Sequence, residues 1–251
     1  MAEAATLSRP AASLPAVDPN ALLAVQNLEA WYGESHVLHG VSFDVRAGEV
    51  VTLLGRNGAG KTTTLKSIIG IMGKRAGSIR FGGQETIKMS SRGVARLGVG
   101  YVPEERGIFS SLSVKENLTL PPVIKPGGLT VDQIHELFPN LKERAGSQGT
   151  KLSGGEQQML AIGRILRTGA KLLLLDEPTE GLAPVIVQQI GRTIERLKGQ
   201  GFTIILVEQN FRFAQTVADR HYVVEQGRVI DMIPNAELDA NIDKLHTYLG
   251  V

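Results

Sequence analysis

The 251-residue sequence contains no cysteine, which excludes structural disulfides and thiolate metal sites and fits a reducing compartment. Excess charge is also missing: the formal net charge is +2, so charge alone indicates no polyanionic partner such as a nucleic acid. Long apolar runs are absent too, because the longest, such as residues 172–175, fall far short of the ~20 residues that a membrane-spanning helix needs. If the protein works at a membrane, another component must hold it there.

The first 20 residues are rich in alanine and proline. They lack a basic start followed by an apolar block, so they do not resemble a secretory signal. We expect residues 1–20 to form a disordered tail. The hydrophobic fraction of 42% is sufficient for a real core, and residues 21–251 have the length of one large domain or one domain with an inserted lobe.

A glycine-rich stretch, GRNGAGKT at residues 55–62, follows an apolar run and precedes a helical pattern. Strand, loop and helix in this order are the context of a phosphate-binding loop. The glycines permit a sharp turn, and the loop and helix-start amides can face anionic oxygens. Lys61 supplies charge for the β- and γ-phosphates, and the Thr62 hydroxyl can ligate Mg²⁺. The alternative is a plain glycine-rich turn that carries a lysine. The predicted phosphate-binding residues are Gly55, Arg56, Asn57, Gly58, Ala59, Gly60, Lys61, Thr62 and Thr63.

A second apolar run, residues 171–175, predicts a buried strand that ends at Asp176 and Glu177. Asp176 can hold Mg²⁺ at the strand end, and Glu177 can orient and deprotonate an attacking water. Most acidic pairs in such positions are solvated strand ends. Together with the phosphate loop, however, this pair favours a nucleotide-hydrolysing site.

The remaining pattern predicts a mixed α/β fold. Alternation at residues 41–45 predicts a half-buried strand, so an antiparallel sheet should lie beside the nucleotide core. Capping boxes at residues 113–116 and 130–133 predict helices, and we expect a helical lobe at about 93–168, inserted in the core. Residues 222–230 predict a hairpin that turns at Gln226-Gly227.

A third motif, LSGGEQQ at residues 152–158, opens a predicted helix. A serine and two glycines at a helix start offer a hydroxyl and free amides to an anion. The alternative is an ordinary helix cap. The chain would therefore carry two phosphate-seeking helix starts, and one subunit has no obvious need of both for a single γ-phosphate.

In their order and spacing, these three motifs resemble the nucleotide-binding subunit of an ATP-binding cassette transporter, over about residues 22–250. The resemblance implies a P-loop NTPase core with an N-terminal antiparallel β-subdomain and an inserted α-helical subdomain. It implies that ATP is sandwiched between the phosphate loop of one subunit and Ser153, Gly154 and Gly155 of the other. It also implies that Tyr32 stacks on adenine, although a strand-end aromatic residue has a plainer explanation.

Three positions depart from the usual family pattern. Glu104 stands where glutamine senses Mg²⁺ and contacts the membrane partner, and Gln209 replaces the switch histidine. The loop after Glu177 lacks its usual aspartate. The same departures resemble a subgroup, the second ATPase of branched-chain amino-acid importers.

The resemblance implies an ATPase on the cytoplasmic face of the cell membrane that uses ATP and Mg²⁺. Glu177 and Gln209 would act in catalysis, and Thr62, Asp176 and Glu104 at the metal. The implied partners are two transmembrane permease subunits, a second ATPase subunit and, indirectly, an external solute-binding protein. That ATPase would be a different chain, although a homodimer is also compatible with the motifs. Two further hypotheses stay open: a different cargo (urea, an amide or a lipid), and an ATP-binding regulatory module that scarcely hydrolyses.

Overall fold

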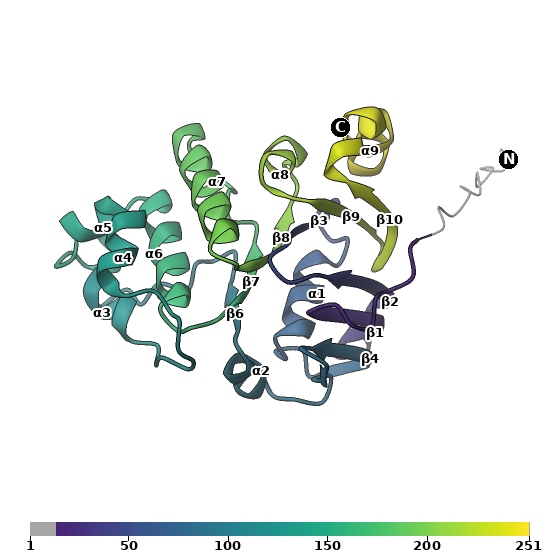
Figure 1. Cartoon of the computed structure of the whole chain (residues 1–251), viewed down its shortest axis with the longest axis horizontal. Helices are drawn as coiled ribbons and strands as arrows, with labels where there is room; N and C mark the ends of the chain where they lie inside the picture. Colours follow the sequence, from purple (N-terminus) through teal and green to yellow (C-terminus); the bar gives the residue numbers. More distant parts are fainter. Residues whose placement is uncertain (1–13, 251) are drawn as a thin grey trace, which may run out of the picture.

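The computed structural model describes residues 14–250, and its larger sheet lies between a helical lobe on one side and an antiparallel sheet on the other (Figure 1). The four-stranded antiparallel sheet has the order β2 (Ser35–Val45), β1 (Leu23–Tyr32), β4 (Lys74–Phe81), β5 (Gln84–Glu85). The six-stranded sheet has the order β10 (Arg228–Pro234), β9 (Arg220–Glu225), β3 (Val50–Leu54), β8 (Thr203–Glu208), β7 (Leu172–Asp176), β6 (Val99–Val102). The expected mixed α/β class and the antiparallel sheet are confirmed. Strand β4 belongs to this sheet although it follows the phosphate loop in the sequence.

The larger sheet is parallel except for its β9–β10 edge, and its central strands are buried on both faces. Because successive side chains of a strand point to opposite faces, each strand contributes to two cores. Leu172 and Leu174 pack toward the antiparallel sheet and α1 (Lys61–Ile68), whereas Leu173 and Leu175 pack toward α6 (Gly154–Leu166) and α7 (Pro184–Gly199). The short apolar runs of the sequence therefore form the middle layer.

The helical lobe extends to one side of the sheets (Figure 1). It contains α3 (Val114–Thr119), α4 (Val131–Leu137), α5 (Pro139–Glu143) and α6. Both predicted capping boxes are present at the starts of α3 and α4. Before the lobe, α2 (Ser91–Leu97) leads into β6, which belongs to the core sheet. The expected lobe boundary of about 93–168 stays a prediction. The remaining helices are α8 (Phe211–Val217) and α9 (Ile242–Leu249).

A buried ion network joins the two sheets. Arg220 at the start of β9 donates from Nε to Glu49 Oε1 at 2.6 Å and from Nη2 to Asp44 Oδ1 of β2 at 2.9 Å. Asp44 also accepts a 2.9 Å hydrogen bond from the backbone of Asp18. Of the expected tail at 1–20, residues 1–13 lie outside the described residues, while Asp18 is thus attached to the sheet.

The predicted hairpin is confirmed as β9 and β10, and its turn forms backbone hydrogen bonds with two other segments. Gln226 and Gly227 both have positive φ, at 47° and 72°, as a tight two-residue turn requires. Gly227 donates its backbone N–H to the Ala59 carbonyl at 2.8 Å, and its own carbonyl accepts from the His39 N–H at 2.8 Å. The turn therefore connects the phosphate loop to the antiparallel sheet.

Candidate functional site

The predicted phosphate loop lies between the buried strand β3 and helix α1. Gly60 precedes the helix with φ 105°, and no side chain caps the first turn, so its amides stay available to a ligand. A β-carbon on Gly60 would lie 2.8 Å from Leu38 Cδ2, and one on Gly55 would collide with the Val224 carbonyl. The neighbouring hairpin and β2 thus force glycine at both positions and set the curvature of the loop.

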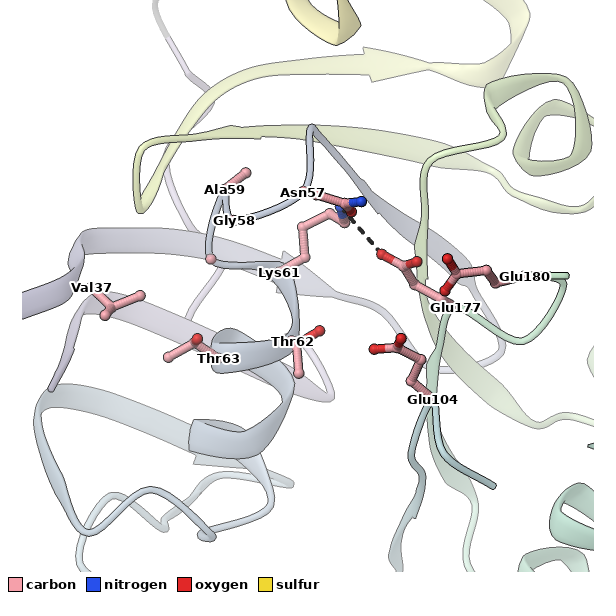
Figure 2. Close-up of a pocket in the computed structure, with 11 residues that line it drawn as sticks. Val37, Asn57, Gly58, Ala59, Lys61, Thr62, Thr63, Glu104, Glu177 and Glu180 are labelled. Carbon is pink, nitrogen blue, oxygen red and sulfur yellow. Dashed lines mark ion pairs between the residues drawn. The ribbon is translucent and has the colours of Figure 1, made fainter. Parts of the chain in front are cut away.

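Lys61 points back over this loop. Its side chain is only 4% exposed, and Nζ donates to the carbonyls of Gly55 at 2.6 Å and Arg56 at 3.1 Å. Glu177 Oε1 lies 3.5 Å from the same nitrogen (Figure 2). Burial lowers the pKa of Lys61, and the negative charge of Glu177 opposes that shift. The ammonium is held by neutral and anionic oxygens, as a phosphate-binding lysine would be.

Asp176 ends β7 and is fully buried. Thr62 Oγ1 donates to its Oδ1 at 2.9 Å, and the Tyr101 hydroxyl donates to its Oδ2 at 2.9 Å. Burial raises the pKa of Asp176, and these two hydrogen bonds act against the rise. Tyr101 lies on the adjacent parallel strand β6 and was not predicted as a site residue. The hydroxyl and carboxylate oxygens that meet here are the ligand types that Mg²⁺ prefers, so the residues fit that ion.

Three glutamate carboxylates face the phosphate loop across a cleft of about 310 Å³ (Figure 2). Glu177 lies in this cleft, and Gln209 donates from Nε2 to Glu177 Oε2 at 2.9 Å. Glu180 and Glu104 line the same cleft, and a hydrogen bond to Glu177 raises the pKa of Glu180. Residues 57–63 form the opposite wall. The structure therefore places Glu104 and Glu177 across the cleft from residues 57–63, and Glu180 is an unpredicted addition. Asp176 joins this group through Thr62, and Gln209 joins it through Glu177.

The third motif, residues 152–158, lies at the start of α6 and outside this cleft. Ser153 caps α6 and forms a capping box with Glu156, whose backbone N–H donates to Ser153 Oγ at 3.3 Å. Gly155 packs so closely on α7 that a β-carbon would lie 2.8 Å from Ile186 Cγ2. Neither Ser153, Gly154 nor Gly155 lines the cleft around Lys61. The two helix starts therefore lie apart in the described chain, and anion binding at the start of α6 stays a prediction.

Comparison with known proteins decides the family. Residues 38–180 match the ABC transporter family. The chain belongs to this family. It is 45% identical over 232 residues to the high-affinity branched-chain amino acid transport ATP-binding protein BraG of Pseudomonas aeruginosa, which covers 91% of this chain and 100% of BraG. It is 36% identical over 236 residues to the lipopolysaccharide export system ATP-binding protein LptB of Escherichia coli K12, covering 92% and 98%.

Solved structures agree on the fold. The crystal structure of a nucleotide-free ATP-binding cassette from an ABC transporter matches with a TM-score of 0.79 at 24% identity, over 92% of this chain and 98% of that one. Cassettes of the ABC family bind nucleotide, dimerise and hydrolyse ATP to drive transport with membrane permease subunits. This chain is therefore an ABC ATPase. Between residues 14 and 250, no helix combines the length and apolarity needed to cross a bilayer.

Two predicted binding residues, Tyr32 from the resemblance and Arg56 from the phosphate-loop motif, do not line the cleft around Lys61. Tyr32 is 49% exposed at the end of β1 and lines a separate hollow with Lys66 and Ile71. Its stacking on adenine stays a prediction. Arg56 turns away from the cleft, and its guanidinium lies against Gly250 after α9.

Glu208 and Thr179 form a buried connection that sequence reasoning missed. Thr179 Oγ1 donates to Glu208 Oε1 at 2.7 Å, which joins the loop after β7 to the end of β8. Burial raises the pKa of Glu208 to about 7. The adjacent Glu177 and Gln209 are therefore carried by two loops fastened to each other. The sequence signal that could have revealed this connection is Glu208 itself, an acidic residue at the end of an otherwise apolar strand.

Proposed function

We propose that this ABC ATPase powers the import of branched-chain amino acids through two transmembrane permease subunits. It works on the cytoplasmic face of the cell membrane beside a second ATPase subunit of different sequence, and an external binding protein delivers the solute. No nucleic acid takes part. The resemblance to BraG supports the cargo. The observation that carries the ATPase role is the convergence of Lys61, Thr62 and Glu177 on one cleft, with Asp176 bonded to Thr62.

Each residue has a defined part in this proposal. The loop amides and Lys61 bind the phosphates, and Tyr32 stacks on the adenine. Thr62 and Asp176, with Glu104 across the cleft, supply oxygen ligands for Mg²⁺, which would neutralise phosphate charge. Ser153, Gly154 and Gly155 complete the partner's site from the start of α6.

Glu177 takes the proton of the attacking water. Its carboxylate is positioned by the 2.9 Å hydrogen bond from Gln209 and lies 3.5 Å from Lys61. Gln209 donates a hydrogen bond but does not titrate. It therefore orients Glu177 and leaves the proton chemistry to that carboxylate.

The test is Glu177→Gln in the assembled transporter. Because the amide keeps the shape but loses the base, ATP binding should persist while kcat falls by roughly 10²–10⁴-fold. Steady-state phosphate release measures the loss, and nucleotide binding checks the site. Glu180→Gln, which alters the same cleft, is the matched control and should lose far less. Turnover near the wild-type rate in Glu177→Gln would remove Glu177 from this role.

A lipid cargo is the second candidate, because the chain also resembles LptB, which is named for lipopolysaccharide export. Purified transporter reconstituted in vesicles distinguishes the two. ATP-dependent uptake of labelled leucine supports the amino-acid importer, whereas ATPase stimulation by lipopolysaccharide without leucine uptake supports the lipid cargo.

A further inference from the structure

Arg106 lies against the start of helix α6, far along the chain from the third motif. It follows β6 in the loop that also carries Glu104. Its Nη1 and Nη2 atoms are 3.3 and 3.6 Å from the position that a β-carbon on Gly154 would take. The guanidinium therefore covers the first residue of α6, where glycine leaves room for it.

The backbone holds Arg106 in this place. Its φ is +62°, an uncommon conformation for a residue with a β-carbon. The Arg106 N–H donates to the Pro103 carbonyl at 2.9 Å. Arg164 of α6 donates from Nη2 to the Arg106 carbonyl at 3.1 Å and from Nη1 to the Gly107 carbonyl at 2.8 Å. The loop is thus fastened to the helix whose start it covers.

The charge of Arg106 is not compensated within the described chain. No carboxylate between residues 14 and 250 forms an ion pair with it. Its Nε is buried and has no hydrogen-bond partner. Glu156 in the first turn of α6 offsets part of the positive charge of the helix start, but its ion pair is with Arg144 and not with Arg106. Arg164 is buried and adds a second cation nearby, and both of its terminal nitrogens donate to carbonyls of this loop.

We propose that Arg106 binds the terminal phosphate of the ATP held by the partner ATPase subunit, together with Ser153, Gly154 and Gly155. This inference rests on the proposed function, in which that phosphate meets the start of α6. A guanidinium offers a planar fork of donors that matches phosphoryl oxygens. The phosphate supplies the anion that the Arg106 guanidinium lacks within the described chain.

The test uses the transporter complex with Glu177→Gln, in which ATP should close the ATPase pair without being consumed. Closure is followed by a fluorescent pair placed on the two ATPase subunits, as a function of ATP concentration. Arg106→Ala should raise the ATP concentration for half-maximal closure by roughly 10–100-fold, since a hydrogen bond to a charged group contributes about 1.5–3 kcal/mol. Arg106→Lys, which keeps the charge but not the fork, should recover part of the loss.

The control is Arg96→Ala, which removes an exposed arginine from α2 and should close like the parent. ADP affinity of the isolated chain should be equal in all variants, because ADP lacks the contacted phosphate. An unchanged closing concentration in Arg106→Ala would overturn the inference. So would a matching loss of ADP affinity, which indicates a structural role. If the parent complex does not close with ATP, the proposed sandwich itself is wrong, and Arg106 loses its role with it.

Discussion

At the scale of single residues, the site depends on acids whose charge is controlled by burial. Glu208 is 3% exposed, and its carboxylate accepts the Thr179 hydroxyl while facing the charges of Glu177 and Lys61. Burial raises its pKa from 4.5 to about 7. The folded state therefore keeps a proton that the unfolded chain releases between these two values.

This shift predicts a pH-dependent stability. Below pH 4.5 both states are protonated, and between 4.5 and about 7 the folded state binds more protons, so stability falls as pH rises. The loss is on the order of 3 kcal/mol once both pKa values are passed. Glu208→Gln should remove it, and urea unfolding at pH 5 and pH 8 measures the difference between wild type and variant. Glu195→Gln, at an exposed position on α7, is the control. Parallel stability curves for wild type and Glu208→Gln would contradict the assignment.

At the scale of elements, the Arg220 network fastens the larger sheet to β2 of the antiparallel sheet. Burial alone would lower the pKa of Arg220, but Glu49 and Asp44 raise it above its ordinary value. The guanidinium also donates to Tyr222 at 3.0 Å. Since β9 forms the hairpin that contacts the phosphate loop, this network also supports the nucleotide site.

Breaking the network should destabilise the whole cassette. Arg220→Met leaves Asp44 and Glu49 as buried, unpaired carboxylates, and removing one partner of such a set costs about 3–5 kcal/mol. Equilibrium urea unfolding at neutral pH measures the loss. Arg192→Met, on an exposed face of α7, removes the same charge and should change stability by less than about 0.5 kcal/mol. Equal effects of the two substitutions would show that the network contributes nothing.

At the scale of the whole molecule, local pattern predicted the elements better than their contacts. The strand β3, the hairpin and the capping boxes follow from periodicity and turn residues, and all are confirmed. Tyr101 and Arg106 could not be assigned, because their roles arise only when β6 pairs with β7 and its loop folds onto α6. Such contacts depend on which strands pair and which loops pack on which helices. The alternation of apolar and polar residues along one strand does not specify this. That the two helix starts serve the sites of different subunits came from the resemblance to a transporter subunit, and it stays a prediction.

The hairpin turn at Gln226-Gly227 has an unusual consequence for protein engineering. Tips of this kind are normally where tags, fluorophores and extra residues are accepted without harm. Here one glycine bonds Ala59 on one flank and His39 on the other, and a β-carbon on it would collide with the Val37 carbonyl. A short insertion after Gln226 should weaken ADP binding measured by calorimetry, whereas the same insertion at the exposed Gly199–Gly201 turn should leave it intact. Equal ADP affinity for both insertions would show that this tip is an ordinary one.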